Sequence, residues 1–108
     1  MDIRDGRLLS VIIPSYNEQD MIGKTFYTVK EILDREQIPF EILFVDDGSR
    51  DLTYPNISRL SAANPEVKGI SFSRNFGKES AIFAGLESAA GNCCVIMDCD
   101  LQHPPETI

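Results

Sequence analysis

Two aspartates, Asp98 and Asp100, stand one residue apart directly after an apolar stretch. In an extended segment, residues two positions apart point to the same side, so both carboxylates would face one pocket while Cys99 points elsewhere or offers its backbone. Two close carboxylates repel each other unless a cation lies between them. Mg²⁺ and Mn²⁺ take oxygen ligands, and Mg²⁺ is commonly held by one or two carboxylates together with substrate phosphates. We therefore expect Asp98, Asp100 and the amide oxygen of Gln102 to bind Mg²⁺ or Mn²⁺.

The alternative for this pair is a solvated acidic turn that caps a helix starting near "PPETI". The apolar stretch before the pair, 93–97, is typical of a buried strand. That position favours the metal site, with Asp98 and Asp100 as the candidate catalytic residues. His103, the only histidine, is expected to pack or to form a hydrogen bond in the "HPPE" turn rather than to bind the metal.

A second acidic pair, Asp46 and Asp47, follows another apolar run and opens the segment "DDGSRD". The two side chains should alternate in direction, so only one is expected to meet a ligand. Asp47 is favoured because it lies further beyond the end of the run, and its carboxylate could accept from a base N–H or a ribose hydroxyl. The alternative is a turn with an Asp and Ser cap, because DG and GS are common turn dipeptides.

Two further segments offer ligand-binding groups. "PSYNE" contains Tyr16, Asn17 and Glu18; Tyr16 could pack on a base, and Glu18 could bind a ribose or a base edge. The alternative is an N-capped loop with an exposed tyrosine. "SRNFGKES" contributes Arg74 and Lys78, which are natural partners of a diphosphate, although cations of this kind are also common as solvated surface charges.

The elements that must position these residues follow from four short apolar runs that alternate with stretches of helical spacing. The first run is nearly continuous and rich in branched residues, as expected of a strand buried on both faces. We predict strands over 8–14, 40–45, 67–73 and 93–97. An α/β fold with a Rossmann-like, mostly parallel sheet and flanking helices follows, and its ligands should lie beyond the carboxyl ends of the strands. All of the candidate site segments above lie at those ends.

Three helices are expected between the strands. The first follows Asn17 as its N-cap and runs to about Glu36, and the second starts between Asp51 and Tyr54. The third ends at Gly91 as its C-cap. It carries a face of small residues that could lie close to a sheet: Ala81, Ala84, Gly85, Ser88 and Ala89.

Composition limits the class of function. The 108 residues, with 43% hydrophobic and 25% charged side chains, have the composition of one soluble globular domain. The formal net charge of -7 argues against binding naked nucleic acid, or an anionic membrane, through general electrostatics. Any phosphate ligand must therefore be held by local groups.

The cysteines and the hydrophobicity of the chain bear on its location. Three cysteines within seven residues, Cys93, Cys94 and Cys99, suit neither a disulfide framework nor a zinc site, which favours a reduced, cytosolic compartment. Cys93 and Cys94 are expected to be small buried strand residues. No apolar run is long enough to span a membrane, and the first residues lack the apolar core of a signal peptide.

Four segments, in this order and spacing, resemble the N-terminal half of the inverting family 2 glycosyltransferases with the GT-A fold. They are "VIIPSYNE", "EILFVDDGSRDLT", "SRNFGKESAIFAGLESAAG" and "VIMDCDLQHPPE". The resemblance is strongest to the polyprenyl-phosphate glycosyltransferases, which comprise dolichyl-phosphate mannose synthases and bacterial undecaprenyl-phosphate relatives. It covers the chain from about Leu8 to Pro105.

The resemblance implies roles for individual residues. Base and ribose would be lined by Pro14, Tyr16, Glu18, Val45 and Asp47. Asp98 and Asp100 would form the D-x-D pair, Gln102 would complete the metal shell, and Cys99 would stand where the family has a small residue. The third segment differs from the mannose synthases and is closer to the bacterial branch, which favours a UDP-sugar over GDP-mannose as the donor.

The acceptor implied by the resemblance is a polyprenyl phosphate. No general base is evident in the chain, and a phosphate monoester, with a second pKa of about 6, is already anionic near neutral pH and could attack without one. GT-A domains continue well past the D-x-D strand, so residues 1–108 are expected to be a truncated nucleotide-sugar-binding half that is inactive alone. The full-length protein is expected at the cytoplasmic face, anchored in the membrane by regions beyond this chain.

Three other functions are compatible with parts of the pattern. A glycosyltransferase acting on a saccharide hydroxyl, or a non-catalytic nucleotide-sugar-binding module, would use the same donor residues. A phosphoacceptor signalling domain would also place acidic residues at strand ends. It needs a lone aspartate at the end of the third strand, where this chain has Phe72, Ser73 and Arg74.

Overall fold

The computed structural model describes residues 8–99, and within them strands and helices alternate strictly. The strands are β1 (Leu9–Ser15), β2 (Phe40–Asp46), β3 (Val67–Ser71) and β4 (Cys93–Ile96). The helices are α1 (Ile22–Arg35), α2 (Thr53–Ala63) and α3 (Lys78–Ser88). The predicted α/β alternation is confirmed.

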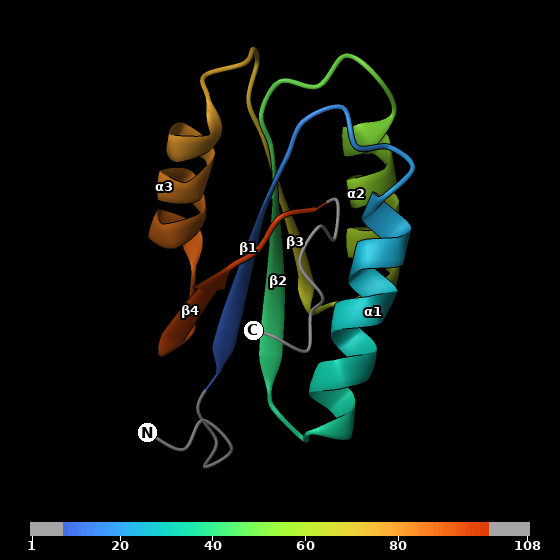
Figure 1. Ribbon diagram of the computed structural model, residues 1–108, viewed down its shortest axis with the longest axis vertical. Helices are drawn as coiled ribbons and strands as arrows, with labels where there is room; N and C mark the ends of the chain where they lie inside the picture. Colours follow the sequence, from blue (N-terminus) through green and yellow to red (C-terminus); the bar gives the residue numbers. More distant parts are fainter. Residues whose placement is uncertain (1–7, 100–108) are drawn as a thin grey trace.

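The four strands form one sheet in the order β3-β2-β1-β4, and every neighbouring pair is parallel. The register places Ser15 opposite Asp46, and Asp46 opposite Ser71. The carboxyl ends of β1, β2 and β3 therefore lie at one level. The loops that follow them, which contain the candidate residues, emerge from the same edge of the sheet (Figure 1).

Helices cover both faces of the sheet: α1 and α2 lie on one side and α3 lies on the other (Figure 1). Alternation along the strands separates two apolar clusters accordingly. The larger cluster joins Val11 and Ile13 of β1 to Phe26 of α1 and Ile57 of α2. The smaller one joins Ile12 and Val45 to Ala81 of α3. The central strands β1 and β2 are buried on both faces, which the continuous apolar run predicted for β1.

The small-residue face predicted for α3 is confirmed in part: Ala84 and Ala89 are half-buried, and Ser88 is exposed. Ala81 and Gly85 are its buried residues. A Cβ added to Gly85 would lie 2.5 Å from Cγ2 of Ile12. The helix backbone therefore packs against β1 at a distance that only a glycine permits.

Strands β1, β2 and β4 differ from their predicted ranges by one residue at one end or both, and three boundaries differ by more. The helix α1 begins at Ile22 rather than after Asn17, because Asn17 has a φ of 51° and its side chain is used between loops instead of as a cap. Strand β3 ends at Ser71 instead of residue 73. Gly91 is not the C-cap of α3, a position held by Ala89. A Cβ added to Gly91 would lie 2.4 Å from Oγ of Ser10, so a glycine is needed at position 91 to let the two segments approach closely.

Strand β4 was expected to be buried, and this was wrong for one of its faces. Its residues alternate between half-buried and exposed: Cys93 is half-buried, Cys94 is exposed, and the side chain of Ile96 is 45% exposed. Within residues 8–99, β4 pairs only with β1, and α3 packs mainly over β1 and β2. In the part of the chain that the structure describes, β4 is thus an edge strand with one face uncovered.

Candidate functional site

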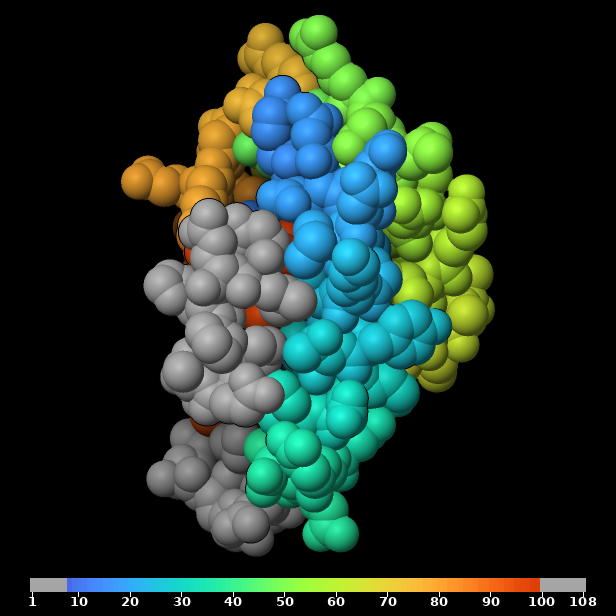
Figure 2. Space-filling view, turned by 45° about the vertical axis from the view of Figure 1, so that its right-hand side comes forward, coloured from blue at the N-terminus to red at the C-terminus, as the bar shows by residue number. Residues whose placement is uncertain are grey.

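Side chain to backbone hydrogen bonds join the loop after β1 to the loop after β2. Asn17 donates its N–H to Oγ of Ser49 at 2.8 Å, and its Oδ1 accepts the N–H of Arg50 at 3.0 Å. The N–H of Glu18 donates to Oγ1 of Thr53 at 2.8 Å. Together with the loop after β3, these loops meet at one end of the molecule (Figure 2). The site is therefore built by loops that brace one another.

Asp51 supports the same junction. Its Oδ1 accepts from the N–H and the hydroxyl of Thr53, and its Oδ2 accepts the N–H of Gln19 at 3.4 Å. Burial by itself would raise the pKa of the Asp51 carboxyl, but these hydrogen bonds outweigh it and hold the pKa below its usual value. Asp51 thus stays ionised at the start of α2, where a negative charge is favourable.

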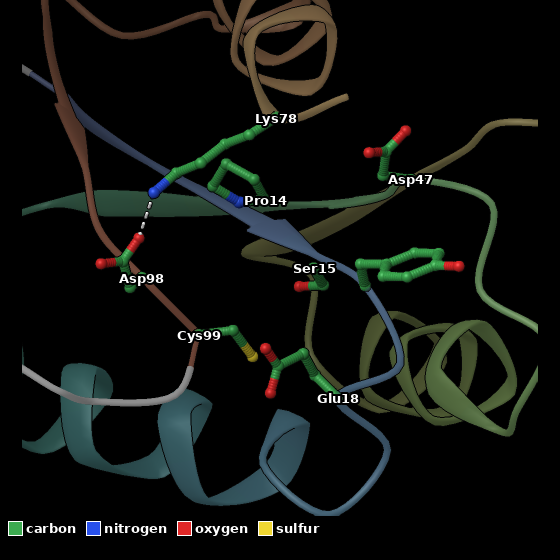
Figure 3. Close-up of a pocket in the computed structure, with 8 residues that line it drawn as sticks. Pro14, Ser15, Glu18, Asp47, Lys78, Asp98 and Cys99 are labelled. Atoms are coloured by element: carbon green, nitrogen blue, oxygen red, sulfur yellow. Dashed lines mark hydrogen bonds and ion pairs between the residues drawn. The ribbon is translucent and has the colours of Figure 1, made fainter. Parts of the chain in front are cut away.

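A pocket of about 270 Å³ opens between these loops and the end of β4. Five of its lining residues come from the ends of β1 and β2 or the loops after them, and Lys78 begins α3 (Figure 3). The lining residues are Pro14, Ser15, Tyr16, Glu18, Asp47, Lys78, Asp98 and Cys99. Seven of these eight were predicted as site residues from the sequence, and the structure brings them together.

Lys78 and Asp98 face each other in this pocket (Figure 3). Nζ of Lys78 lies 2.6 Å from Oδ1 of Asp98. The side chains are 60% and 34% exposed, so the pair is open to solvent and to a ligand. An exposed pair of this kind contributes little to stability, about 0 to 1 kcal/mol. Its significance is that it places a cation and a carboxylate at the same point of the pocket.

The carboxylate of Asp47, in the wall of the pocket, accepts hydrogen bonds from the loop before α3. Its Oδ1 accepts the N–H of Phe76 at 2.8 Å, and its Oδ2 accepts the N–H of Gly77 at 3.0 Å. Nδ2 of Asn75 donates to the same Oδ2 at 3.1 Å. The residue is only 4% exposed. These hydrogen bonds join Asp47 to the loop before α3. The expected contact of Asp47 with a base or a ribose stays a prediction.

Cys99 is buried and fixes the segment after β4 against α1. Its carbonyl oxygen accepts a short hydrogen bond from the hydroxyl of Thr25, which is itself fully buried. Met97, two residues earlier, is also buried, as predicted. Asp98, between them, remains partly exposed at the pocket. This local alternation of buried and accessible side chains is what the sequence analysis expected around Asp98.

Three of the predicted substrate-binding residues do not line the pocket. Val45 is fully buried in the cluster beneath α3. Asn17 joins the two loops described above, and the guanidinium of Arg74 lies over the ring of Phe76, 4.7 Å from its centroid. Ser15, which does line the pocket, was missed by the sequence analysis. Its signal was a polar residue at the last position of an apolar strand.

The residues that the structure describes include only one of the three predicted metal ligands. Asp98 is the one predicted ligand within residues 8–99, because Asp100 and Gln102 lie outside the described residues, as does His103. Across residues 8–99, no group of three or more His, Cys, Asp and Glu side chains is arranged to hold a metal ion. The described part therefore offers a carboxylate oxygen of Asp98, already paired with an ammonium group, and the metal remains a prediction.

No helix within residues 8–99 is both long enough and apolar enough to cross a membrane.

Comparison with known proteins places these features in a family. The profile of "Glycosyl transferase family 2" matches residues 10–108. The chain is 46% identical over 99 residues to an uncharacterized glycosyltransferase, YkcC, of Bacillus subtilis, covering 92% of this chain and 31% of that protein. It is 42% identical over 100 residues to a bactoprenol glucosyl transferase of Shigella phage SfV, covering 93% of this chain and 33% of that protein. The chain spans about a third of the length of these relatives.

Among solved structures, the fold is similar to that of the mannosyltransferase PcManGT from Pyrobaculum calidifontis, determined in complex with GDP-Man and Mn²⁺. The TM-score is 0.73 at 27% sequence identity, and the match covers 87% of this chain and 27% of that one. The sheet with its flanking helices thus matches the GT-A glycosyltransferase fold. By its sequence profile, its relatives and its fold, this chain belongs to glycosyl transferase family 2.

Proposed function

We propose that this chain forms the donor-binding half of a glycosyltransferase that transfers a sugar from a nucleoside diphosphate sugar to a polyprenyl phosphate, with inversion. The observation that carries the proposal is the pocket at the carboxyl edge of the sheet, where Lys78 and Asp98 meet. Membership of glycosyl transferase family 2 supports the reaction class. We propose a UDP-sugar as the donor because the third segment, which begins with "SRNFGKES", differs from that of the mannose synthases.

The two ends of the pocket suit different parts of such a donor. Tyr16 is exposed beside Pro14 and Glu18 at the end of β1, which provides an aromatic surface and a carboxylate for the base and ribose. Lys78, at the start of α3, supplies an ammonium group for the diphosphate, and Arg74 is a second cation on the loop before α3. Because the chain as a whole carries a net charge of -7, these local cations decide where an anionic ligand can bind.

The chemistry of transfer follows from the charges. The bond between the anomeric carbon and the diphosphate oxygen breaks, and a bond to an oxygen of the acceptor phosphate forms on the opposite face of the sugar. Negative charge grows on the departing diphosphate, and Lys78 stabilises it electrostatically. Asp98, with Asp100 and Gln102, would hold Mg²⁺ or Mn²⁺, which when bound supplies further stabilisation of that leaving group.

The acceptor and the location of the protein are proposed together. A phosphate monoester needs no general base near neutral pH, because its second pKa is about 6. The relative from phage SfV is named for transfer to bactoprenol, a lipid. We therefore propose a polyprenyl-phosphate acceptor, and a full-length protein that works at the cytoplasmic face of a membrane to which it is anchored.

Calorimetric titration tests the donor half of this proposal. The protein, with Mn²⁺ present, is titrated with UDP-glucose, UDP-N-acetylglucosamine and GDP-mannose, and we expect binding, strongest for a UDP-sugar. Lys78→Met should weaken it about tenfold or more, the effect of losing one charge-assisted contact. Lys24→Met, which removes an exposed lysine of α1 away from the pocket, is the matched control and should bind as the wild type does. Absence of binding by all three donors would contradict the proposal.

The acceptor is tested on the full-length protein. We expect it to transfer radiolabelled sugar to a polyprenyl phosphate in detergent and not to a free saccharide, with Asp98→Asn strongly reducing the rate. Transfer to a saccharide hydroxyl alone would favour a different acceptor class. Donor binding without any transfer would indicate a nucleotide-sugar-binding module.

A further inference from the structure

The segment that leads into β4 is held against the sheet by the carboxylate of Glu41. Its Oε2 accepts the N–H of Ala90 and the hydroxyl of Ser10, and Oγ of Ser10 accepts the N–H of Gly91 at 2.9 Å. Nζ of Lys68 pairs with the other oxygen, Oε1. Glu41 and Ser10 are buried and lie opposite each other in β2 and β1. Two consecutive N–H groups are therefore fixed from inside the sheet.

The next residue, Asn92, is fixed to the residue before β1. Its N–H donates to the carbonyl oxygen of Leu8 at 2.8 Å, and its Oδ1 accepts the N–H of Leu8 at 3.2 Å. A Cβ added to Gly91 would lie 2.6 Å from the same carbonyl oxygen, so a side chain at this position would force the two segments apart. We call the contacts of residues 90–92 with Leu8, Ser10 and Glu41 the β4 clamp. The β4 clamp ends directly before β4 begins.

The side chains of β4 do not by themselves fix its register. Cys93 and Val95 pack against the larger apolar cluster, and Cys94 and Ile96, which are also apolar, are exposed. A shift of the strand by one residue would exchange one apolar set for the other. A half-buried strand with a polar outer face opposes such a shift, but Cys93–Ile96 has no polar face. The polar contacts of the β4 clamp are left to select the register.

The register decides which side chain after β4 faces the pocket. The alternation continues beyond the strand, because Met97 and Cys99 are buried in the larger cluster and Asp98 between them is partly exposed. Asp98 points toward Lys78, whereas Cys99 points toward Glu18 (Figure 3). A shift by one residue would turn Cys99 toward Lys78 and the carboxylate of Asp98 toward the apolar cluster. The place of Asp98 in the pocket therefore depends on the register of β4.

We propose that Glu41 is a positioning residue: through the β4 clamp it fixes the register of β4 against β1, and so it places the carboxylate of Asp98 in the pocket. Glu41 and Ser10 lie near the amino ends of their strands, whereas the pocket lies at the carboxyl ends, so Glu41 acts without touching a ligand. The role of Asp98 toward a metal ion rests on the proposed function; the control of the register by Glu41 does not.

Modification of Cys99 by iodoacetamide, measured by mass spectrometry on the full-length protein without ligand, tests the register. Cys99 is 2% exposed and should react slowly in the wild type. In Glu41→Gln the reaction should accelerate about tenfold or more, because charge-assisted hydrogen bonds are lost and the amide NH₂ must face a donor. Ser10→Ala, a milder variant, should accelerate it about threefold.

Ile57→Val is the control for a general loss of stability. It removes a buried methyl group from α2, away from the β4 clamp, and Cys99 should react at close to the wild-type rate. Equal acceleration in Glu41→Gln and Ile57→Val would overturn the proposal, and so would an unchanged rate in both Glu41→Gln and Ser10→Ala.

Binding of UDP and GDP with Mn²⁺ or with EDTA tests the consequence for the pocket. In Glu41→Gln, nucleotide binding with Mn²⁺ should weaken about tenfold, because Asp98 no longer faces the metal ion. Binding in EDTA should be unchanged, because the residues at the ends of β1 and β2 keep their places. Equal losses in the two conditions, or no loss in either, would overturn the placement of Asp98 by Glu41. If the wild type binds neither nucleotide, the proposed function fails, whereas modification of Cys99 still decides whether Glu41 sets the register.

Discussion

Among single residues, Glu41 shows how a carboxylate can be held inside the sheet far from the pocket. It is buried in β2, and Nζ of Lys68 lies 2.7 Å from its Oε1. Its Oε2 accepts the hydroxyl of Ser10 at 2.6 Å and the N–H of Ala90 at 2.7 Å. Burial alone would raise the pKa of the Glu41 carboxyl, but these partners outweigh it, and the pKa lies below its ordinary value of 4.5. This network ties three strands to the segment that leads into β4.

The depressed pKa predicts a specific pH dependence. Glu41→Gln should lower the free energy of unfolding by about 2 kcal/mol at neutral pH, because charge-assisted hydrogen bonds are lost. The stabilisation by Glu41 is fully present above its unfolded-state pKa, near 4.5, and is lost as the pH falls through its lower folded-state pKa. Urea unfolding should therefore show the two proteins converging below pH 4.5.

Glu31→Gln, on the exposed side of α1, is the control and should follow the wild type at all pH values. A difference between Glu41→Gln and wild type that stayed constant down to pH 2 to 3, with both proteins still folded, would show that the charge of Glu41 does not carry the effect.

The sequence predicted most of the residues that line the pocket, but it did not predict which of them contact one another. Lys78 and Asp98 were each expected near the ligand edge, and the structure pairs them across twenty positions of sequence. Such a contact depends on how far α3 lies from β4, which no local pattern encodes. The roles of Ser10 and Glu41 were missed because a polar residue inside an apolar strand does not reveal its partner.

At the level of elements, the sequence predicted that the small residues of α3 would allow this helix to pack closely on the sheet, and α3 packs closely on β1. Gly85 lies against Ile12, a β-branched side chain with little rotational freedom. Gly85→Ala should destabilise the protein by about 1 to 3 kcal/mol, because the added methyl group overpacks this contact. Thermal unfolding measures the change, and the expected sign is opposite to the usual effect of Gly→Ala in a helix.

Gly23→Ala provides the matched control within α1. Nothing lies within 4 Å of a Cβ added to Gly23. The same substitution should there raise the stability by about 0.5 to 1 kcal/mol, through helix propensity alone. Stabilisation by both substitutions would show that α3 does not pack on β1 as closely as described.

Two elements were predicted incompletely for different reasons. The start of α1 was placed too early because Asn17 is a good N-cap by type, yet tertiary hydrogen bonds to the loop of Arg50 engage it instead. The exposure of β4 was missed because an apolar run such as "CCVI" indicates burial without saying which neighbours supply it. In both cases the local signal was correct in kind, and long-range packing decided the outcome.

On the scale of the whole molecule, the relation of this chain to its relatives sets the last prediction. Because it spans about a third of their length, the activity of those proteins need not reside in this third. We expect the 108-residue chain to bind a nucleoside diphosphate sugar and to transfer the sugar poorly or not at all, while the full-length protein transfers it. Parallel assays at equal concentration, with donor binding as the control for folding, measure this. Robust transfer by the chain alone would contradict it.

What the sequence determined by itself was the alternation of strands and helices, the edge at which polar groups gather and the family to which their spacing belongs. These features depend on local periodicity and on the order of motifs, which are present in any single chain. Only the tertiary structure decided that the carboxylate of Asp47 accepts from the N–H groups of Phe76 and Gly77, that Lys78 meets Asp98, and that Val45 lies in the core. Those outcomes depend on distances between separate loops, which arise when the sheet twists and the helices pack.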